Sequence, residues 1–548
     1  MGAQGTGGLD TALPGLEADL ARLDELARGV AAAWAPRTLA ATTLGRERAI
    51  LRLFGVGGLD RAGMPLAGAV VDRYVAGAPD RLARGVTLPF AMALVEYDEP
   101  IQELAIDVAA GHVDLAMEAE LLAEPKHRTM AQAAAADLAE RAMDRIDANR
   151  TARHELIAVL SDPPRPWIST AATEPEARAA AVEAGDLVRA GFDVIRVEVP
   201  MGRELHGLLE ESGIEFERWR PRPASARDGR AGGRRDIVDT SLVDLAPSGS
   251  QRGLAFIRST IDEIAADRRA YVRLASAAPP LAAPEQAVVA AFERVDLVVA
   301  DVMAEIVASG VDPDRALADH AFAATIHARA GTLVLVGPGP LVVGPDLAAG
   351  IPASTATRSG RALALQLLGI HMARAAGLAA DQIVAGAVPT WLAEERLGPA
   401  FALAEVVIRR RLLPEHPLSL SVLTTAGEAG VSALAIAAGI APADDHACVL
   451  HVAAPGHDRA VAASSARAAL AVGATLAHSR IGAALGGVAL DHAHETVRAA
   501  IRALDGLQSD GWQSILGREF DDPDRRRFGA DAVTERRDSN DPFATLVG

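Results

Sequence analysis

Apolar residues in the first part of the chain recur at the spacing of an α-helix. Side chains three and four positions apart lie on one face of a helix, so such a series predicts a helix with one buried face. We therefore predict a helical region over residues 1–160, which ends in the turn-forming residues 161–164, and a further turn at Asn149-Arg150. The two clearest series are Leu16, Leu20, Leu23 and Leu26, and Ala135, Leu138, Ala142 and Ile146.

After Pro166 the pattern changes to short β-branched runs separated by helical stretches. Eight such runs with helices between them are typical of a (β/α)8 barrel. We therefore predict an α/β fold with a TIM-like barrel over residues 161–475. The helical N-terminal region precedes it, and C-terminal helices with a charged tail follow over residues 476–548. An open, doubly wound sheet is the alternative, because its strands and helices alternate in the same way. The runs are 167–170, 193–199, 271–276, 295–301, 332–337, 382–388, 418–423 and 448–453.

Two stretches fall outside this alternation. Residues 217–235 are basic and rich in Pro and Gly, which predicts a long loop at the mouth of the barrel. This loop either forms a local anion site or is simply solvated. Residues 520–548 are highly charged and predict a loose tail.

Polar residues near the ends of the predicted strands are the first candidates for function, because the carboxyl ends of barrel strands carry the active site. Arg196 lies in the second run, and Arg273 lies in the third, which ends at Ser276. Two guanidinium groups can bind a carboxylate or a phosphate. Asp301 ends the fourth run and can hold an amine or act as a base. The alternatives are an ion-pair layer inside the barrel and, for His451, a satisfied core histidine.

Composition narrows the chemistry. The formal net charge of −18 argues against a general nucleic-acid binder, because acidic surfaces repel phosphate backbones. Lys126 is the only lysine among 54 Lys and Arg residues. Chemistry that needs an amine must therefore use Lys126 or a lysine of another chain. Cys448 is the only cysteine, which excludes a disulfide framework and a CxxC metal site within this chain.

Targeting and cofactor motifs are missing from the sequence. Residues 1–20 lack the basic and apolar regions of a signal peptide, and the longest apolar run, 429–443, is too short to span a membrane. We expect a cytoplasmic protein. Neither GxGxxG nor GxxxxGK[ST] occurs, and the histidines lack the spacing of metal ligands. Residues 444–449 begin like the DxHxxG motif of cobalamin sites, but Val449 replaces Gly, so we expect no such site here.

Four stretches together resemble one enzyme family. They are 47–72, with Glu47-Arg48-Ala49, Arg52 to Asp60, Pro65-Leu66 and Val70-Val71-Asp72; 149–153; 193–202; and 271–301. In their order and spacing they resemble the α subunit of lysine 5,6-aminomutase, over about residues 35–430, and the chain is similar to a divergent member of that family.

The resemblance implies a barrel with added helices and an isomerase that uses adenosylcobalamin and pyridoxal phosphate. It implies a radical 1,2-amino shift on lysine or a related basic amino acid. A small β subunit in an α2β2-like assembly would supply the cobalamin domain and the lysine that binds pyridoxal phosphate. Under this hypothesis Asp301 is the catalytic candidate, which holds the pyridinium nitrogen, the cofactor hydroxyl or the substrate amine. The cofactor-binding candidates are Arg196, Arg273, Ser250, Gln251 and Ser276.

The sequence departs from the family in its pocket. It reads Gly202-Arg203-Glu204 where the family has a GQS-like turn, and 276–280 has no aromatic residue where the family stacks one on the cofactor ring. A family lysine near the seventh strand is absent as well. Two alternatives therefore stay open, namely a partner subunit of a cobalamin mutase that binds no pyridoxal phosphate, and a non-catalytic or unrelated barrel.

Overall fold

The structure is a computed structural model of the whole chain. The parts that it describes are residues 15–58, 65–76, 78, 80–197, 248, 250–278, 281–309, 311–338, 353–389, 391–392, 395, 398–422, 447–452, 463–468, 486–516 and 533–535. The predicted loop at 217–235 and the Gly202-Arg203-Glu204 turn lie outside these residues.

Eight parallel strands close into a barrel in which each strand pairs with the next along the chain. The first and last strands also pair, with Trp167 opposite Val449. This pairing excludes the open sheet and confirms the predicted (β/α)8 barrel, and every predicted run contributes one strand. The strands are β2 (Trp167–Ala172), β3 (Val194–Val197), β4 (Arg273–Ala277), β5 (Leu297–Val299), β6 (Leu333–Val336), β7 (Ile383–Gly386), β8 (Leu418–Val422) and β9 (Ala447–Val452).

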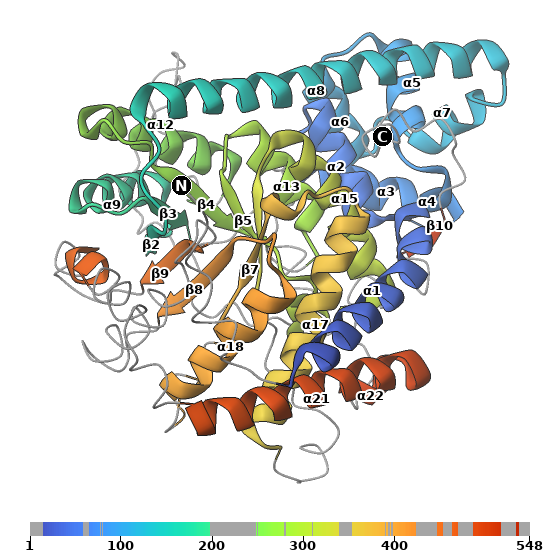
Figure 1. Cartoon of the computed structure of the whole chain (residues 1–548). Coiled ribbons are helices and arrows are strands. Elements are labelled where there is room, and N and C mark those ends of the chain that lie inside the picture. The colour runs from blue at the N-terminus through green and yellow to red at the C-terminus, as the bar shows by residue number, and fades with distance from the viewer. Residues whose placement is uncertain are drawn as a thin grey trace, which may run out of the picture.

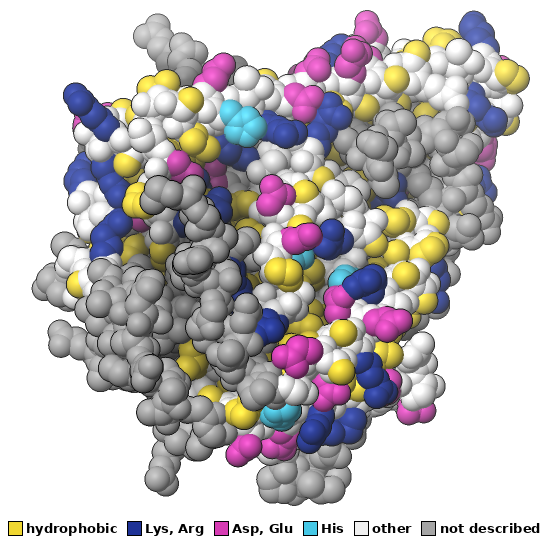
Figure 2. Space-filling view, in the orientation of Figure 1, with side chains coloured by type: hydrophobic (Ala, Val, Ile, Leu, Met, Phe, Trp, Pro, Cys, Tyr) yellow, Lys and Arg dark blue, Asp and Glu magenta, His cyan; other side chains and the backbone are white. Residues whose placement is uncertain are grey.

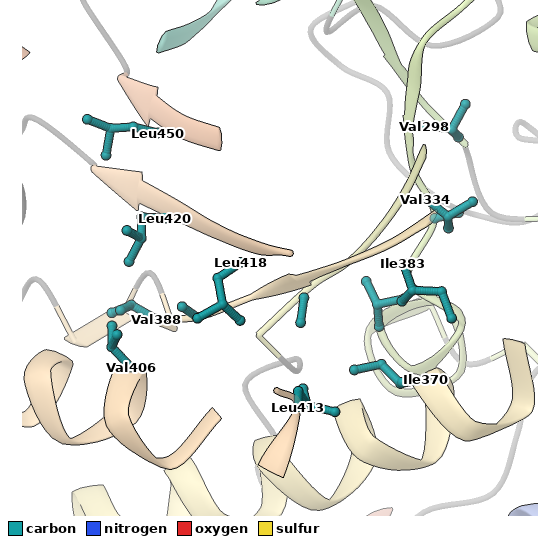
Figure 3. Close-up of a cluster of buried hydrophobic side chains, with 14 of the residues drawn as sticks. Val298, Val334, Ile370, Ile383, Val388, Val406, Leu413, Leu418, Leu420 and Leu450 are labelled. Carbon is teal, nitrogen blue, oxygen red and sulfur yellow. The ribbon is translucent and has the colours of Figure 1, made fainter. Parts of the chain in front are cut away.

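Both faces of the barrel strands are buried, which explains why the runs are almost continuously apolar. Outward side chains such as Val298, Val334 and Ile383 belong to the core that the strands share with the surrounding helices. Figure 3 shows Ile383 beside Ile370 of this core. Inward side chains such as Trp167 and Leu297 form a separate, smaller cluster inside the barrel. This alternation decides which polar residues face the interior of the barrel and which face the helices.

Helices follow the strands and cover the outside of the barrel (Figure 1). Four of them start with a side-chain cap, which Ser250, Asp301, Asp312 and Ser354 provide. A helix that follows a barrel strand runs antiparallel to it, so its start lies at the carboxyl end of that strand. The described helices of this layer are α9 (Ala177–Ala190), α12 (Gln251–Arg268), α13 (Ala283–Phe292), α14 (Val302–Ser309), α15 (Pro313–Ala330), α17 (Thr355–Ala375) and α18 (Gly398–Leu412), with the short η1 (Ala380–Gln382) before β7.

The first N-terminal helix packs on the barrel, and most of the others share a core of their own. Apolar residues of α1 (Glu17–Ala40), such as Leu20 and Leu23, belong to the barrel core. The remaining helices surround a second core, which reaches the barrel through α13 and α15. They are α2 (Leu44–Phe54), α3 (Leu66–Val75), α4 (Asp80–Arg84), α5 (Thr87–Tyr97), α6 (Ile101–Ala110), α7 (Leu115–Leu121) and α8 (Pro125–Leu160).

The predicted turn at Asn149-Arg150 is wrong, because α8 runs through it without a break. The Asn149 amide donates hydrogen bonds to the carbonyl oxygens of Ala291 (3.1 Å) and Phe292 (2.7 Å) at the end of α13. Such a bond satisfies the last carbonyls of a neighbouring helix. A residue that favours turns is thus used here as a tertiary contact within a helix.

The C-terminal region returns to the N-terminal one. Helix α21 (Gly486–Asp510) packs beside α1 and α17 (Figure 1), and the short α22 (Gln513–Leu516) follows it. Strand β10 (Val533–Glu535) pairs antiparallel with β1 (Ala41–Thr43). The expectation of a loose tail over 520–548 is therefore wrong for these three residues, because β1 offers them an unpaired strand edge.

Candidate functional site

Polar side chains from three adjacent strands meet inside the barrel, toward the carboxyl ends. Nη2 of Arg196 on β3 lies 3.2 Å from Nε2 of His451 on β9. Nδ1 of the same histidine lies 3.3 Å from the Ser169 hydroxyl on β2, its neighbour in register. The side chain of Arg196 is only partly buried, while His451 and Ser169 are buried. The three residues place a cation at the interior of the barrel.

Burial, and then the neighbouring Arg196 cation, lower the pKa of His451 to about 3. The ring is therefore neutral at physiological pH. Because guanidinium can only donate, Nε2 accepts from Arg196, and Nδ1 carries the proton and donates to Ser169. His451 thus orients Arg196 and adds no charge of its own, so the cation can attract an anionic group.

Asp301 lies on the other side of the barrel, directly after β5. Its Oδ1 accepts hydrogen bonds from the amides of Met303 and Ala304, both at 3.1 Å, at the start of α14. Burial raises the pKa of this carboxyl, although the two amides, the neighbouring His320 and the amide of Gly337 act in the opposite direction. A carboxyl with a raised pKa at the carboxyl end of a barrel strand is a candidate for proton transfer.

Gly337, which follows β6, makes this arrangement possible. A Cβ at this position would overlap with Oδ2 of Asp301. Glycine therefore lets the backbone approach the carboxylate closely enough for its amide to donate to it.

A second group of polar atoms lies at the start of α12. The hydroxyl of Ser250 accepts from the amide of Gly253 at 3.1 Å and caps the helix. Ser248 is fully buried, its amide donates to the carbonyl of Pro175 after β2, and its hydroxyl has no hydrogen-bond partner among the described residues. Amides and the dipole at a helix start attract phosphate groups. Ser248 was not among the sequence candidates, although it lies two residues before Ser250, which was one of them.

The other sequence candidates lie elsewhere. Arg273 is the first residue of β4 and therefore lies at the amino end of the barrel, which corrects the expectation that it lies at the mouth. Its guanidinium carbon lies 3.3 Å from the centre of the Trp167 ring, and its Nη1 lies 2.7 Å from Asp162 Oδ1. The strand begins two residues later than the predicted run, so Arg273 forms part of the base of the barrel.

Two further candidates face the helix layer. Ser276 lies on the outward face of β4, where its hydroxyl accepts from Nε2 of Gln286 on α13 at 2.7 Å. Nε2 of Gln251 donates to Oε1 of Glu293 at 2.7 Å, at the end of α13. Each side chain therefore stabilises the packing of α13. Of the predicted set, Arg196 faces the barrel interior, Asp301 follows β5 and Ser250 caps α12.

Comparison with sequence models of known families shows to which family the chain belongs. The sequence model of the family described as D-lysine 5,6-aminomutase TIM-barrel domain of alpha subunit matches residues 16–207 and 248–425, more than half of the chain. The chain belongs to this family. The family predicted from the sequence is thereby confirmed. The matched ranges include β2 to β8 and end before β9 and α21.

The curated relatives are distant. Lysine 5,6-aminomutase alpha subunits from Acetoanaerobium sticklandii and Fusobacterium nucleatum subsp. nucleatum are each 24% identical over 378 residues. The alignment covers 69% of this chain and 65% of each relative, so the chain matches slightly less than two thirds of their length. This distance agrees with a divergent member of the family.

The chain is also similar, at a low level, to solved structures of dihydropteroate synthases. A dihydropteroate synthase from Anaplasma phagocytophilum is 15% identical, with a TM-score of 0.33, and covers 56% of this chain and 98% of its own. The enzyme from Thermus thermophilus is 17% identical, with a TM-score of 0.30, and covers 58% of this chain and 95% of its own. Similarity at this level gives no information about the function of this chain.

The described residues were also compared with the features of membrane helices, metal sites and nucleic-acid-binding surfaces. Among the described residues no helix is long and apolar enough to cross a membrane. Within the same residues no three His, Cys, Asp or Glu side chains gather into a possible metal site. On the face drawn in Figure 2 the coloured acidic and basic side chains are interspersed, so no basic stripe that could follow a nucleic-acid backbone stands out there.

Proposed function

We propose that the chain is the large subunit of an adenosylcobalamin- and pyridoxal-phosphate-dependent aminomutase that acts on lysine or a related basic amino acid. The observation that carries the proposal is the family match across the N-terminal helices and seven of the eight barrel strands. When bound, the two cofactors supply the radical chemistry and the electron delocalisation that a 1,2-amino shift requires. The lone cysteine is in keeping with a reducing, cytoplasmic location.

The start of α12 fits the phosphate of pyridoxal phosphate. The buried Ser248 hydroxyl without a described partner and the first amides of the 18-residue helix are the donors that a phosphate group needs. Ser250 holds the helix start in place as its N-cap. We therefore assign the phosphate to this cradle rather than to Arg273, which lies at the other end of the barrel.

The barrel interior supports the other roles. Arg196, oriented by His451, offers a cation for the substrate carboxylate. Asp301 carries its proton to a higher pH than an ordinary aspartic acid, so its Oδ2 is suited to hold or exchange a proton with an amine or a ring nitrogen. A closed barrel around these groups keeps solvent from reactive species.

The proposal requires a partner. The chain has one lysine, Lys126, which lies on the N-terminal helix α8 outside the barrel. We therefore propose that a small subunit binds cobalamin and supplies the lysine that binds pyridoxal phosphate, in a hetero-oligomer of α2β2 type. The relatives are named alpha subunits, which supports an assembly with a second kind of subunit.

One observation favours a second candidate function. The residue after β4 is Ala278, which offers no aromatic ring for stacking on a cofactor. A cobalamin mutase subunit that binds no pyridoxal phosphate would have no need of such a ring. The two functions differ in one cofactor and can be separated by a spectrum.

The experiment is co-expression of this chain, with the only affinity tag, and the small chains encoded beside it. The purified sample is mixed with adenosylcobalamin and pyridoxal phosphate, freed of unbound ligand and examined by absorption. A co-purifying small subunit with both chromophores supports the aminomutase. A corrinoid spectrum alone supports the second function, and the absence of partner and chromophores contradicts both.

A matched pair of variants then tests the site. Arg196→Gln should raise KM for the amino acid at least tenfold, because it removes the charge that faces the substrate carboxylate. Arg374→Gln makes the same change at a partly exposed arginine near Glu415, at the end of α17, and should leave KM unchanged. An unchanged KM in Arg196→Gln would remove Arg196 from the substrate site.

A further inference from the structure

A buried network of charged residues lies between the helix layer and the carboxyl ends of two strands. Arg409 on α18 is fully buried and forms an ion pair with Glu405, one turn earlier on the same helix. Its Nε donates to Oε1 of Gln366 on α17 at 2.7 Å, and its Nη2 donates to the carbonyl of Pro338 at 3.0 Å. The guanidinium group therefore joins two helices to the segment that follows β6.

The network also holds the end of β7. Nε2 of Gln366 donates to the carbonyl of Gly386 at 2.8 Å. A Cβ on Gly386 would lie 2.6 Å from the backbone nitrogen of Pro338, so the ends of β6 and β7 touch at this point. Arg409 and Gln366 thus bind the two strand ends through backbone atoms, which fixes their position and not only the packing of the helices.

The segment held by Arg409 is the one that contacts Asp301. Pro338 follows Gly337, whose amide donates to the Asp301 carboxylate and whose Cα is so close to Oδ2 that no Cβ fits. A shift of Pro338 would therefore move the donor away from Asp301. Two residues separate the guanidinium group from the carboxylate along this path.

On its other side the network ends on the C-terminal helix. Nε2 of His492 on α21 lies 3.1 Å from Oε1 of Glu405, and its ring stacks on Phe401 with centres 4.2 Å apart. Close packing holds α21 in place, because a Cβ on Gly360 of α17 would lie 2.5 Å from the Ala499 side chain. The matched family ranges end at residue 425, so His492 belongs to a part of this chain that the family match does not include.

The burial of the group gives the network its rigidity. A buried guanidinium group must keep its hydrogen-bond partners, because an unpaired charge in the protein interior is very costly. Arg409 consequently has one arrangement that satisfies Glu405, Gln366 and the Pro338 carbonyl together. A hydrogen bond from His492 fixes the second oxygen of Glu405 and with it the direction of the ion pair.

We propose that Arg409 is a positioning residue that holds the Gly337-Pro338 segment against Asp301, and that His492 of the C-terminal helix fixes Arg409 through Glu405. The link to turnover rests on the proposed function, in which Asp301 takes part in the reaction. The mechanical part, from α21 to the strand ends, does not depend on it.

The first test is hydrogen exchange of the full-length chain without cofactors, followed in peptides that cover residues 333–337 and 383–388. Arg409→Gln and His492→Leu should increase exchange in these peptides at least fivefold relative to the wild type, since the carbonyl and the strand ends lose their support. His492→Gln keeps a hydrogen-bonding group and should restore the wild-type rates. Arg374→Gln is the control for the loss of an arginine at a distance from the network, and it should show the wild-type rates.

The second test is the pH profile of kcat in the complex with its partner subunit. His492→Leu should lower kcat more than tenfold with little change in KM, and the limb of the profile that belongs to Asp301 should move to higher pH. The reason is that a weaker amide donor stabilises the carboxylate less. His492→Gln should return the limb to its wild-type position.

The two tests separate the support of the strand ends by Arg409 from its effect on Asp301. Unchanged exchange in both peptides for His492→Leu, or equal increases in peptides of α2 and α5, would overturn the positioning role. If Arg409→Gln does not fold, His492→Leu, which removes no charge from the guanidinium pair, carries the test. Faster exchange with an unaltered kcat and pH profile would overturn the role for Asp301, while the spectrum of the co-purified complex tests the proposed function separately.

Discussion

Asp301→Asn separates the structural role of this carboxyl from its chemical one. Asparagine caps helices about as well as aspartate, so its Oδ1 can still accept from Met303 and Ala304, which lie 3.1 Å away in the wild type. The Nδ2 group would replace Oδ2 and face the amide of Gly337, donor against donor. Loss of that acceptor should cost about 1–2 kcal/mol of unfolding free energy.

A second effect of the substitution compensates part of this loss. Because burial raises the pKa of Asp301, the ionised form is less favourable in the folded chain than in the unfolded chain. The stability that belongs to protonated Asp301 is present below the unfolded pKa and is lost as pH rises through the folded pKa. Asparagine carries no charge. As pH rises from the unfolded to the folded pKa of Asp301, the free energy of unfolding should therefore fall less in the variant than in the wild type. We expect a net change of at most about 1 kcal/mol at pH 7.

The activity should fall far more than the stability. Loss of a general acid or base lowers the rate by about 10²–10⁴-fold. The assay is kcat of the proposed complex with a small subunit, beside urea unfolding of this chain alone at pH 5 and pH 7. Asp312→Asn is the matched control, because Asp312 caps α15 through the amides of Asp314 and Arg315 (3.0 and 3.3 Å). It should keep the wild-type kcat.

Two outcomes would refute this reasoning. Wild-type turnover in Asp301→Asn would show that the carboxyl is only a helix cap. A loss of several kcal/mol in stability together with the loss of activity would show that the structural role dominates and that the kinetic effect is indirect.

Three further predictions follow from single contacts. Gly337→Ala should lower the unfolding free energy by about 1–3 kcal/mol, because its Cβ would overlap with Asp301 Oδ2, and a thermal melt measures this. Ser248→Ala should leave the apo stability nearly unchanged, since its hydroxyl has no described partner, and should weaken pyridoxal phosphate binding about tenfold in a titration. Burial raises the pKa of Asp319 to about 7, so this carboxyl should make the wild-type free energy of unfolding fall as pH rises from about 4 to 7, by at most about 4 kcal/mol. Asp319→Asn should remove this contribution to the pH dependence, which urea unfolding at several pH values measures.

The eight strands could be predicted because local sequence decides them. Each run is short and rich in apolar residues, as a strand that is buried on both faces requires. The helices between them, such as α12 with its Ser250 cap, have start signals that act within one turn. The family resemblance depends on the same kind of local information, namely motifs in a fixed order.

The site was only partly predictable because the side of a strand and its exact start depend on tertiary packing. Arg273 and Ser276 lie in one strand, yet one faces the base of the barrel and the other the helix layer. A shift of two residues in the start of β4 is enough to move Arg273 away from the mouth. Burial and strand register decide where the strand starts, and neither can be predicted from a run of six residues alone.

By itself the sequence determined the barrel, the order of its elements, the family and the presence of a single lysine, because these follow from periodicity, motif order and composition. Only the tertiary structure decided the orphaned hydroxyl of Ser248, the orientation of Arg196 by His451 and the network from His492 to Pro338. These contacts join positions far apart in the chain. Their energies come from burial and from hydrogen-bond geometry, which exist only after the chain has closed around them.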